Sequence, residues 1–133
     1  MRKHKFKIDI FNKTWDVEFR VCASVSGVTA FSTKWLGHKD VGGPYQAICC
    51  TREGKRIAVL VFYEEGMGSG IVAHEIAHLV DRMTPPEAWL TMYVEEEKTV
   101  VNGTYCHNVY EARATCTEEI TRELWSWYYD KSS

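Results

Sequence analysis

Two histidines and a glutamate stand close together in the stretch GIVAHEIAHLVDRM, at residues 70–83. His74, Glu75 and His78 form an HExxH pattern, in which the histidines are four residues apart. Side chains at this spacing on a helix lie one above the other, so both imidazoles can reach one tetrahedral zinc ion. The intervening glutamate is then angled toward a water on that ion and can act as a general base. The pattern predicts one bound Zn²⁺ and hydrolytic chemistry.

The periodicity of residues 70–83 predicts a helix. At about 100° per residue, the polar residues of this stretch fall on one arc and the apolar residues on the opposite arc. The polar arc contains His74, Glu75, His78, Asp81 and Arg82. A solvated stripe is the alternative interpretation, but two histidines lower helix propensity and add little solubility. We expect Asp81 to orient a ligand histidine or to pair with Arg82, which otherwise faces solvent.

A catalytic zinc site needs a third protein ligand from elsewhere in the chain. His107 and Glu111 are the leading candidates, and Glu118 and Asp81 come after them. Glu118 is four residues before Arg122 and can pair with it, which leaves Glu111 free. The sequence also leaves open which residue donates a hydrogen bond to a developing oxyanion. The candidates are His107, Tyr105, Tyr110 and Arg122.

The first half of the chain predicts strands. Residues 5–11 and 14–22 alternate between apolar and polar residues and predict a β-hairpin, while residues 47–51 and 56–63 predict two further strands. Residues 32–44 are expected to form a loop.

The second half changes to helical periodicity. Helices are expected over residues 70–83, more weakly over 86–98, and from about 108 to 129, where one side is apolar. The fold class is therefore α+β, with an N-terminal antiparallel β-sheet packed against the HExxH helix and a C-terminal helix.

Composition narrows the classes of function. A chain of 133 residues with 45% hydrophobic and 26% charged residues is typical of a single globular domain, residues 1–133. A net charge of -2 gives no general attraction to nucleic acid or to anionic membranes. No apolar run reaches the length of a membrane span or a secretory signal, so a soluble, cytoplasmic protein is expected. Five cysteines without a CxxC pair favour free thiols.

Two segments resemble a known family of enzymes. HEIAHLVD, at residues 74–81, and YEARATCTEEITREL, at residues 110–124, are similar to segments of small single-domain metallopeptidases encoded by bacteriophages and bacteria. The likeness covers about residues 55–125 and is of the gluzincin type of zinc metallopeptidase. It implies a minimal zincin-like fold, with Glu75 as general base and three zinc ligands, His74, His78 and Glu111. Larger gluzincins often carry an aspartate four residues after the ligand glutamate, where this chain has Thr115.

The sequence thus predicts a zinc metallopeptidase whose partner is a peptide or protein substrate. In the resembling families an edge strand beside the HExxH helix holds the substrate backbone, and the strand over residues 56–63 is the candidate here. The alternative is a binding or structural module that contains zinc but has little or no activity, such as a phage protein that acts on a host partner. The unpaired Glu75 favours catalysis, because a purely structural zinc site gains nothing from a carboxylate beside the metal. The oligomeric state is left open.

Overall fold

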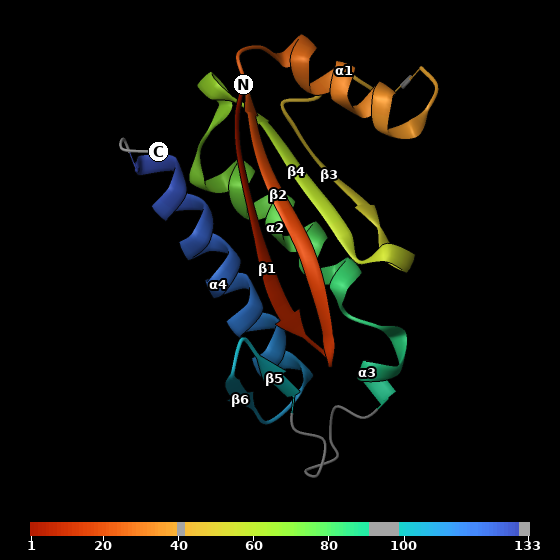
Figure 1. Ribbon diagram of the computed structural model, residues 1–133, viewed down its shortest axis with the longest axis vertical. Helices are drawn as coiled ribbons and strands as arrows, with labels where there is room; N and C mark the ends of the chain where they lie inside the picture. The colour runs from red at the N-terminus through yellow and green to blue at the C-terminus, as the bar shows by residue number, and fades with distance from the viewer. Residues whose placement is uncertain (40–41, 91–98, 131–133) are drawn as a thin grey trace.

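A four-stranded sheet with helices on both faces forms the centre of the structure (Figure 1). This computed structural model describes residues 1–39, 42–90 and 99–130. Across the sheet the strands follow the order β1-β2-β4-β3. Their bounds are Arg2–Ile10 for β1, Lys13–Cys22 for β2, Ala47–Arg52 for β3 and Ile57–Tyr63 for β4. The α+β class is confirmed, and β1 and β3 are the edge strands.

The predicted N-terminal hairpin is present, but the sheet is mixed rather than antiparallel. β1 and β2 are joined by a turn in which Phe11 and Asn12 both have positive φ, at 52° and 61°. β3 and β4 also pair antiparallel, whereas β2 and β4 run parallel. Parallel neighbours need a crossover connection, which helix α1 and strand β3 supply between them. The expectation of an antiparallel sheet was wrong because it contained no crossover helix.

Helix α1 (Val25–Leu36) was not predicted, and its last residues overlap the start of the segment 32–44 that was expected to form a loop. The side chain of Ser24 accepts a hydrogen bond from the backbone N–H of Gly27 and caps the helix start, and Gly37 ends the helix with φ 80°. Val28 is fully buried against the face of the sheet that carries Val59 and Val61. Packing on the sheet therefore stabilises a segment whose own sequence is only a modest helix former.

Two helices cover the opposite face. They are α2 (Ser69–Met83) and α4 (Val109–Tyr129), and α4 is capped by Asn108, whose side chain accepts from the N–H of Glu111 at 2.9 Å. The apolar side expected for the last helix is confirmed, since all of its members are buried. They are Val109, Cys116, Ile120, Leu124 and Trp127. Burial of this stripe against Phe19, Leu60 and α2 forms the main core.

Short elements complete the chain. They are the 3₁₀ turns Glu53–Lys55 and Glu64–Gly66, helix α3 (Pro86–Leu90), and the strands β5 (Thr99–Val101) and β6 (Thr104–Cys106). The helix expected over residues 86–98 begins as predicted, but residues 91–98 lie outside the described residues. None of the five cysteines forms a disulfide, as expected.

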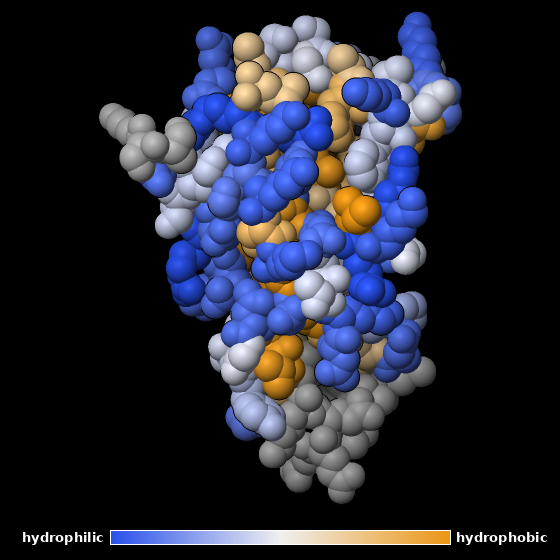
Figure 2. All heavy atoms as spheres, viewed as in Figure 1, coloured by the Kyte–Doolittle hydropathy of each residue, from blue (hydrophilic) through white to orange (hydrophobic). Residues whose placement is uncertain are grey.

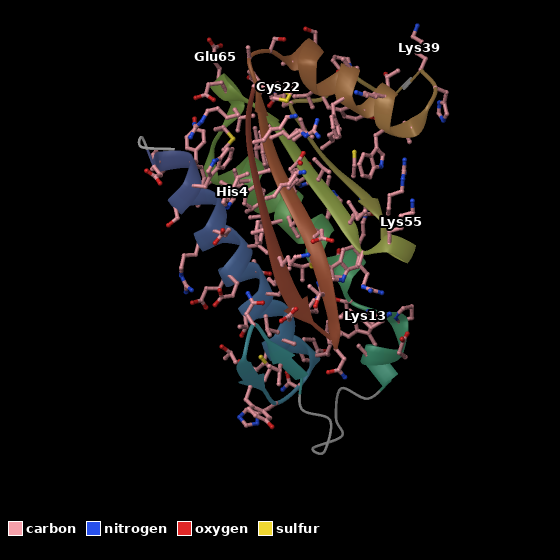
Figure 3. All side chains as sticks on the ribbon, in the orientation of Figure 1. His4, Lys13, Cys22, Lys39, Lys55 and Glu65 are labelled. Atoms are coloured by element: carbon pink, nitrogen blue, oxygen red, sulfur yellow. The ribbon has the colours of Figure 1, made fainter. Side chains whose placement is uncertain are left out.

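The start of β1 is joined to the end of α4. The imidazole Nε2 of His4 lies 2.8 Å from Oε1 of Glu123, and Figure 3 shows His4 on the side of β1 next to α4. Arg2 donates to the carbonyl of Tyr128 at 3.1 Å and lies over the Trp127 ring. These contacts hold both ends of the described chain at one end of the molecule. None of the helices described is long and apolar enough to cross a membrane.

The other face of β1 and β2 carries charge. Figure 2 shows hydrophilic side chains over these strands, where Lys7 pairs with Asp16 at 2.5 Å and Lys5 with the largely buried Glu18 at 3.6 Å. Because α1 covers only part of this face, its charged residues pair with one another across the hairpin.

Candidate metal centre

Helix α2 places the HExxH residues on its open side. It begins after Gly68 and ends at Thr84, before two prolines that cannot continue it. His74 and His78 are exposed, as expected for the polar arc. Glu75, which was also assigned to that arc, is instead only 7% exposed. The predicted arc was too broad, because β3 packs beside α2 and covers the flank on which Glu75 lies.

The two histidines converge. Their Nε2 atoms are 3.1 Å apart, and their rings meet edge to face with centroids 4.7 Å apart. Two nitrogens bound to one tetrahedral zinc ion at ordinary distances lie about 3.3 Å apart. The spacing of His74 and His78 therefore fits a shared zinc ion without rearrangement of these two side chains.

Glu75 lies between this pair and the neighbouring strand. Burial raises the pKa of its carboxyl above the ordinary value, while the nearby side chains of His78, His74 and Arg82 act in the opposite direction. A carboxylate with a raised pKa is a stronger base than an ordinary one.

An open groove of about 690 Å³ runs between α2, α1 and the edge strand β3. A smaller hollow of about 320 Å³ continues it past His74 toward Gly70 and Ile71. Ala47, His74 and Glu75 line both hollows, so the groove extends on either side of the HExxH residues. An extended chain of several residues can therefore lie along it.

The backbone of β3 presents polar groups along its free edge, beside this groove. The carbonyl of Gln46 accepts from Tyr63 of β4, and strand groups alternate in direction with period two. The carbonyls of Ala47, Cys49 and Thr51 thus point to the free edge. Consistent with this, the carbonyl of Cys49 accepts from Arg82 at 2.8 Å. Arg82 was expected to face only solvent, and its link to β3 corrects that expectation.

The acidic candidates on α4 lie apart from the histidine pair. The side of α4 that faces α2 carries Arg113, which contacts Asp81 and Thr84, and Cys116, which contacts Met83. Residues two apart on a helix point about 200° apart. Glu111 is two residues before Arg113 and Glu118 two residues after Cys116, and both are exposed on the outer side.

The remaining candidates have other partners or positions. Asp81 pairs with Arg113 of α4 rather than with a histidine or Arg82. Glu118 pairs with Arg122 at 2.6 Å, as predicted. His107, Tyr105 and Tyr110 are exposed near the start of α4, where the Tyr110 ring meets Trp89. Within residues 1–39, 42–90 and 99–130, no three His, Cys, Asp or Glu side chains come close enough together to hold a metal ion.

The structure adds residues that the sequence did not single out. Cys49, Thr51 and Tyr45 line the groove opposite the histidines, and Trp35 of α1 lines its far side. No local pattern identifies them, because they reach the groove through the order of the strands and the position of α1. Comparisons with protein families, curated proteins and solved structures give no match for this chain.

Cys49 allows a direct chemical test of the groove. Burial raises the pKa of its thiol to about 12, with Glu75 adding to the shift and Arg82 opposing it. At pH 8 we expect iodoacetamide to alkylate Cys49 on the order of 10³-fold more slowly in the native protein than in urea. The native rate should rise about tenfold per pH unit while the fold persists. Mass spectrometry of the Cys49 peptide measures both rates, and equal rates in native and unfolded protein would contradict the half-buried position of this thiol.

Proposed function

We propose that this protein is a zinc-dependent metallopeptidase with His74 and His78 as metal ligands and Glu75 as general base. The observation that carries the proposal is the 3.1 Å approach of the two Nε2 atoms, directly beside a buried carboxylate and a groove. A zinc ion held there supplies a Lewis acid for a carbonyl and lowers the pKa of a water molecule toward neutrality.

The side chain of Glu75 moves the proton in this reaction. Its carboxylate accepts a proton from the attacking water and passes that proton to the nitrogen of the departing amine. Shielding by β3 keeps the carboxylate partly desolvated, and this burial raises its pKa above the ordinary value. The resemblance implies Glu111 as the third ligand, with His107 and Glu118 as its alternatives, but Glu111 and Glu118 lie on the side of α4 away from the histidines in this structure.

The edge of β3 is suited to hold a substrate backbone. The candidate strand named from the sequence, β4, is internal, whereas β3 lies at the edge and beside α2. The outward N–H and carbonyl of Ala47 lie next to His74 on the groove wall. A peptide that adds to β3 as a further strand would pass the histidines with its backbone aligned. Because the groove continues on both sides of His74, the proposal favours internal peptide bonds over chain ends.

A zinc-containing binding module is the second candidate. It is favoured by one observation: in the part of the chain that the structure describes, no third ligand joins the histidine pair. Such a module would keep zinc and the groove but would not hydrolyse peptides.

Metal content and peptide cleavage together test the proposal. We expect purified protein to bind one zinc ion per chain and to cleave members of a peptide library. A chelator should abolish cleavage and added zinc should restore it, because both ligand histidines are exposed to solvent. Zinc binding without cleavage of any peptide would favour the binding module, and absence of zinc binding would overturn both candidates.

A further inference from the structure

Arg82 holds a fixed position at one end of the groove. Its Nη1 donates to the carbonyl of Cys49 at 2.8 Å and approaches Oγ1 of Thr51 at 3.5 Å. The side chain thereby spans from α2 to the edge strand and lines the same groove as His74 and His78. A guanidinium held in this way is oriented before any ligand arrives.

Arg82 forms no ion pair with an acidic side chain among the residues that the structure describes, although Glu75 lies close enough for the two charges to interact. Its two hydrogen bonds to oxygen atoms use Nη1, and the Cys49 thiol is a further partner, so part of the five-donor guanidinium is left for another acceptor. Arg113 and Arg122, in contrast, are each paired with carboxylates. A carboxylate is the acceptor that matches the planar fork of a guanidinium best.

The distance from Arg82 to the histidines sets where such a carboxylate would lie. Arg82 follows His78 by four residues, which is about 6 Å along the helix axis. An extended peptide advances about 3.3 Å per residue. A carboxylate on Arg82 would thus belong to a residue about two positions from the bond that faces the histidines.

We propose that Arg82 is a specificity-determining residue that binds a carboxylate of the peptide substrate about two residues from the cleaved bond. This inference rests on the proposed peptidase function. The carboxylate is an acidic side chain or the chain terminus, and these two sources share the same chemistry. The groove continues beyond Arg82 to Arg52 and Glu53, which favours the acidic side chain.

Peptide binding to zinc-loaded Glu75→Gln protein tests this inference without turnover. The probes are fluorescein-labelled alanine hexapeptide amides with one glutamate at each position in turn, a matched glutamine series, and one all-alanine peptide with a free C-terminus. Fluorescence anisotropy should show one glutamate position binding about 10- to 100-fold more tightly than its glutamine match, as expected for a charged hydrogen-bonded pair. A preference for the free C-terminus alone would assign the carboxylate to the chain end.

Variants of the two groove arginines distinguish direct binding of a carboxylate by Arg82, called the anchor below, from a general electrostatic attraction between the groove and acidic peptides. Arg82→Gln should remove the preference for glutamate, and Arg82→Lys should retain only part of it, because lysine keeps the charge but not the fork. Arg52→Gln is the matched control: it removes the same charge from the same groove, but at a position beyond Arg82 where the guanidinium lies over the Trp35 ring and donates to the Trp35 carbonyl at 2.6 Å. Far-ultraviolet circular dichroism checks that each variant is folded.

Three outcomes would overturn the inference. They are equal binding of glutamate and glutamine peptides to the parent protein, equal losses in Arg82→Gln and Arg52→Gln, and a full preference that survives in Arg82→Gln. The outcomes that would overturn the proposed function are different ones. Cleavage of both peptide series at equal rates by the wild type would keep the peptidase and reject the anchor, whereas selective binding without cleavage would keep the anchor and reject the peptidase.

Discussion

Substitution of Glu75 by glutamine is expected to lower the rate of peptide hydrolysis by about 10² to 10⁴-fold, the usual contribution of a positioned general base. The amide has nearly the same shape as the carboxylate but cannot accept the proton of the attacking water. Zinc content should stay at the wild-type level, since Glu75 is not one of the proposed ligands. Initial rates on a cleaved peptide, measured beside metal analysis of the same sample, give both quantities.

The stability of this variant is a necessary control. Glu75 is only 7% exposed and its pKa is raised, so a neutral amide at this position should be tolerated by the fold. Thermal unfolding of the two proteins should therefore be similar. Retention of full activity by Glu75→Gln would remove Glu75 from the reaction, and a large loss of stability would assign the residue a structural role instead.

Replacement of His78 by alanine is expected to have the largest effect on metal binding. It removes one of two converging imidazoles, so the affinity for zinc should fall by more than the roughly 10- to 100-fold that loss of an outer partner of a ligand costs. His74→Ala should behave in the same way. Competition with a zinc-responsive chelating dye measures the affinities, and cleavage should fall in parallel.

Two further variants locate the third ligand. His107→Ala removes an exposed histidine near the start of α4, and Glu111→Gln removes the exposed carboxylate on its first turn. If Glu111 is the ligand, only Glu111→Gln should lower the affinity for zinc. Unchanged affinity in both variants would show that neither His107 nor Glu111 is a ligand and would direct the search to Glu118.

Features that depend on local periodicity could be predicted from the sequence. The hairpin strands alternate with period two, and the buried side of α4 repeats with the helical period, so neither depends on distant residues. The meeting of His74 and His78 is likewise fixed by their spacing within one helix.

Features that depend on distant parts of the chain were missed. The burial of Glu75 arises from the strand β3, which lies beside α2 only because β4 is internal to the sheet. The partner of Arg82 is a backbone carbonyl of that strand, and a backbone acceptor cannot be recognised from the types of the residues. Helix α1 was missed because packing of residues such as Val28 stabilises it, more than the helix propensity of its own residues.

The groove is built mostly from one continuous stretch of chain. Apart from the side chains of α1, its walls come from Tyr45 and from the sequence between Ala47 and Arg82. The contact that joins its two principal walls, α2 and β3, runs from Arg82 to Cys49 and lies between residues 33 apart in sequence. The partners in the parallel pairing of β2 with β4, such as Asp16 and Ile57, are only slightly farther apart. The groove and the parallel strand pair therefore close loops of similar length, so neither is expected to form far ahead of the other in folding.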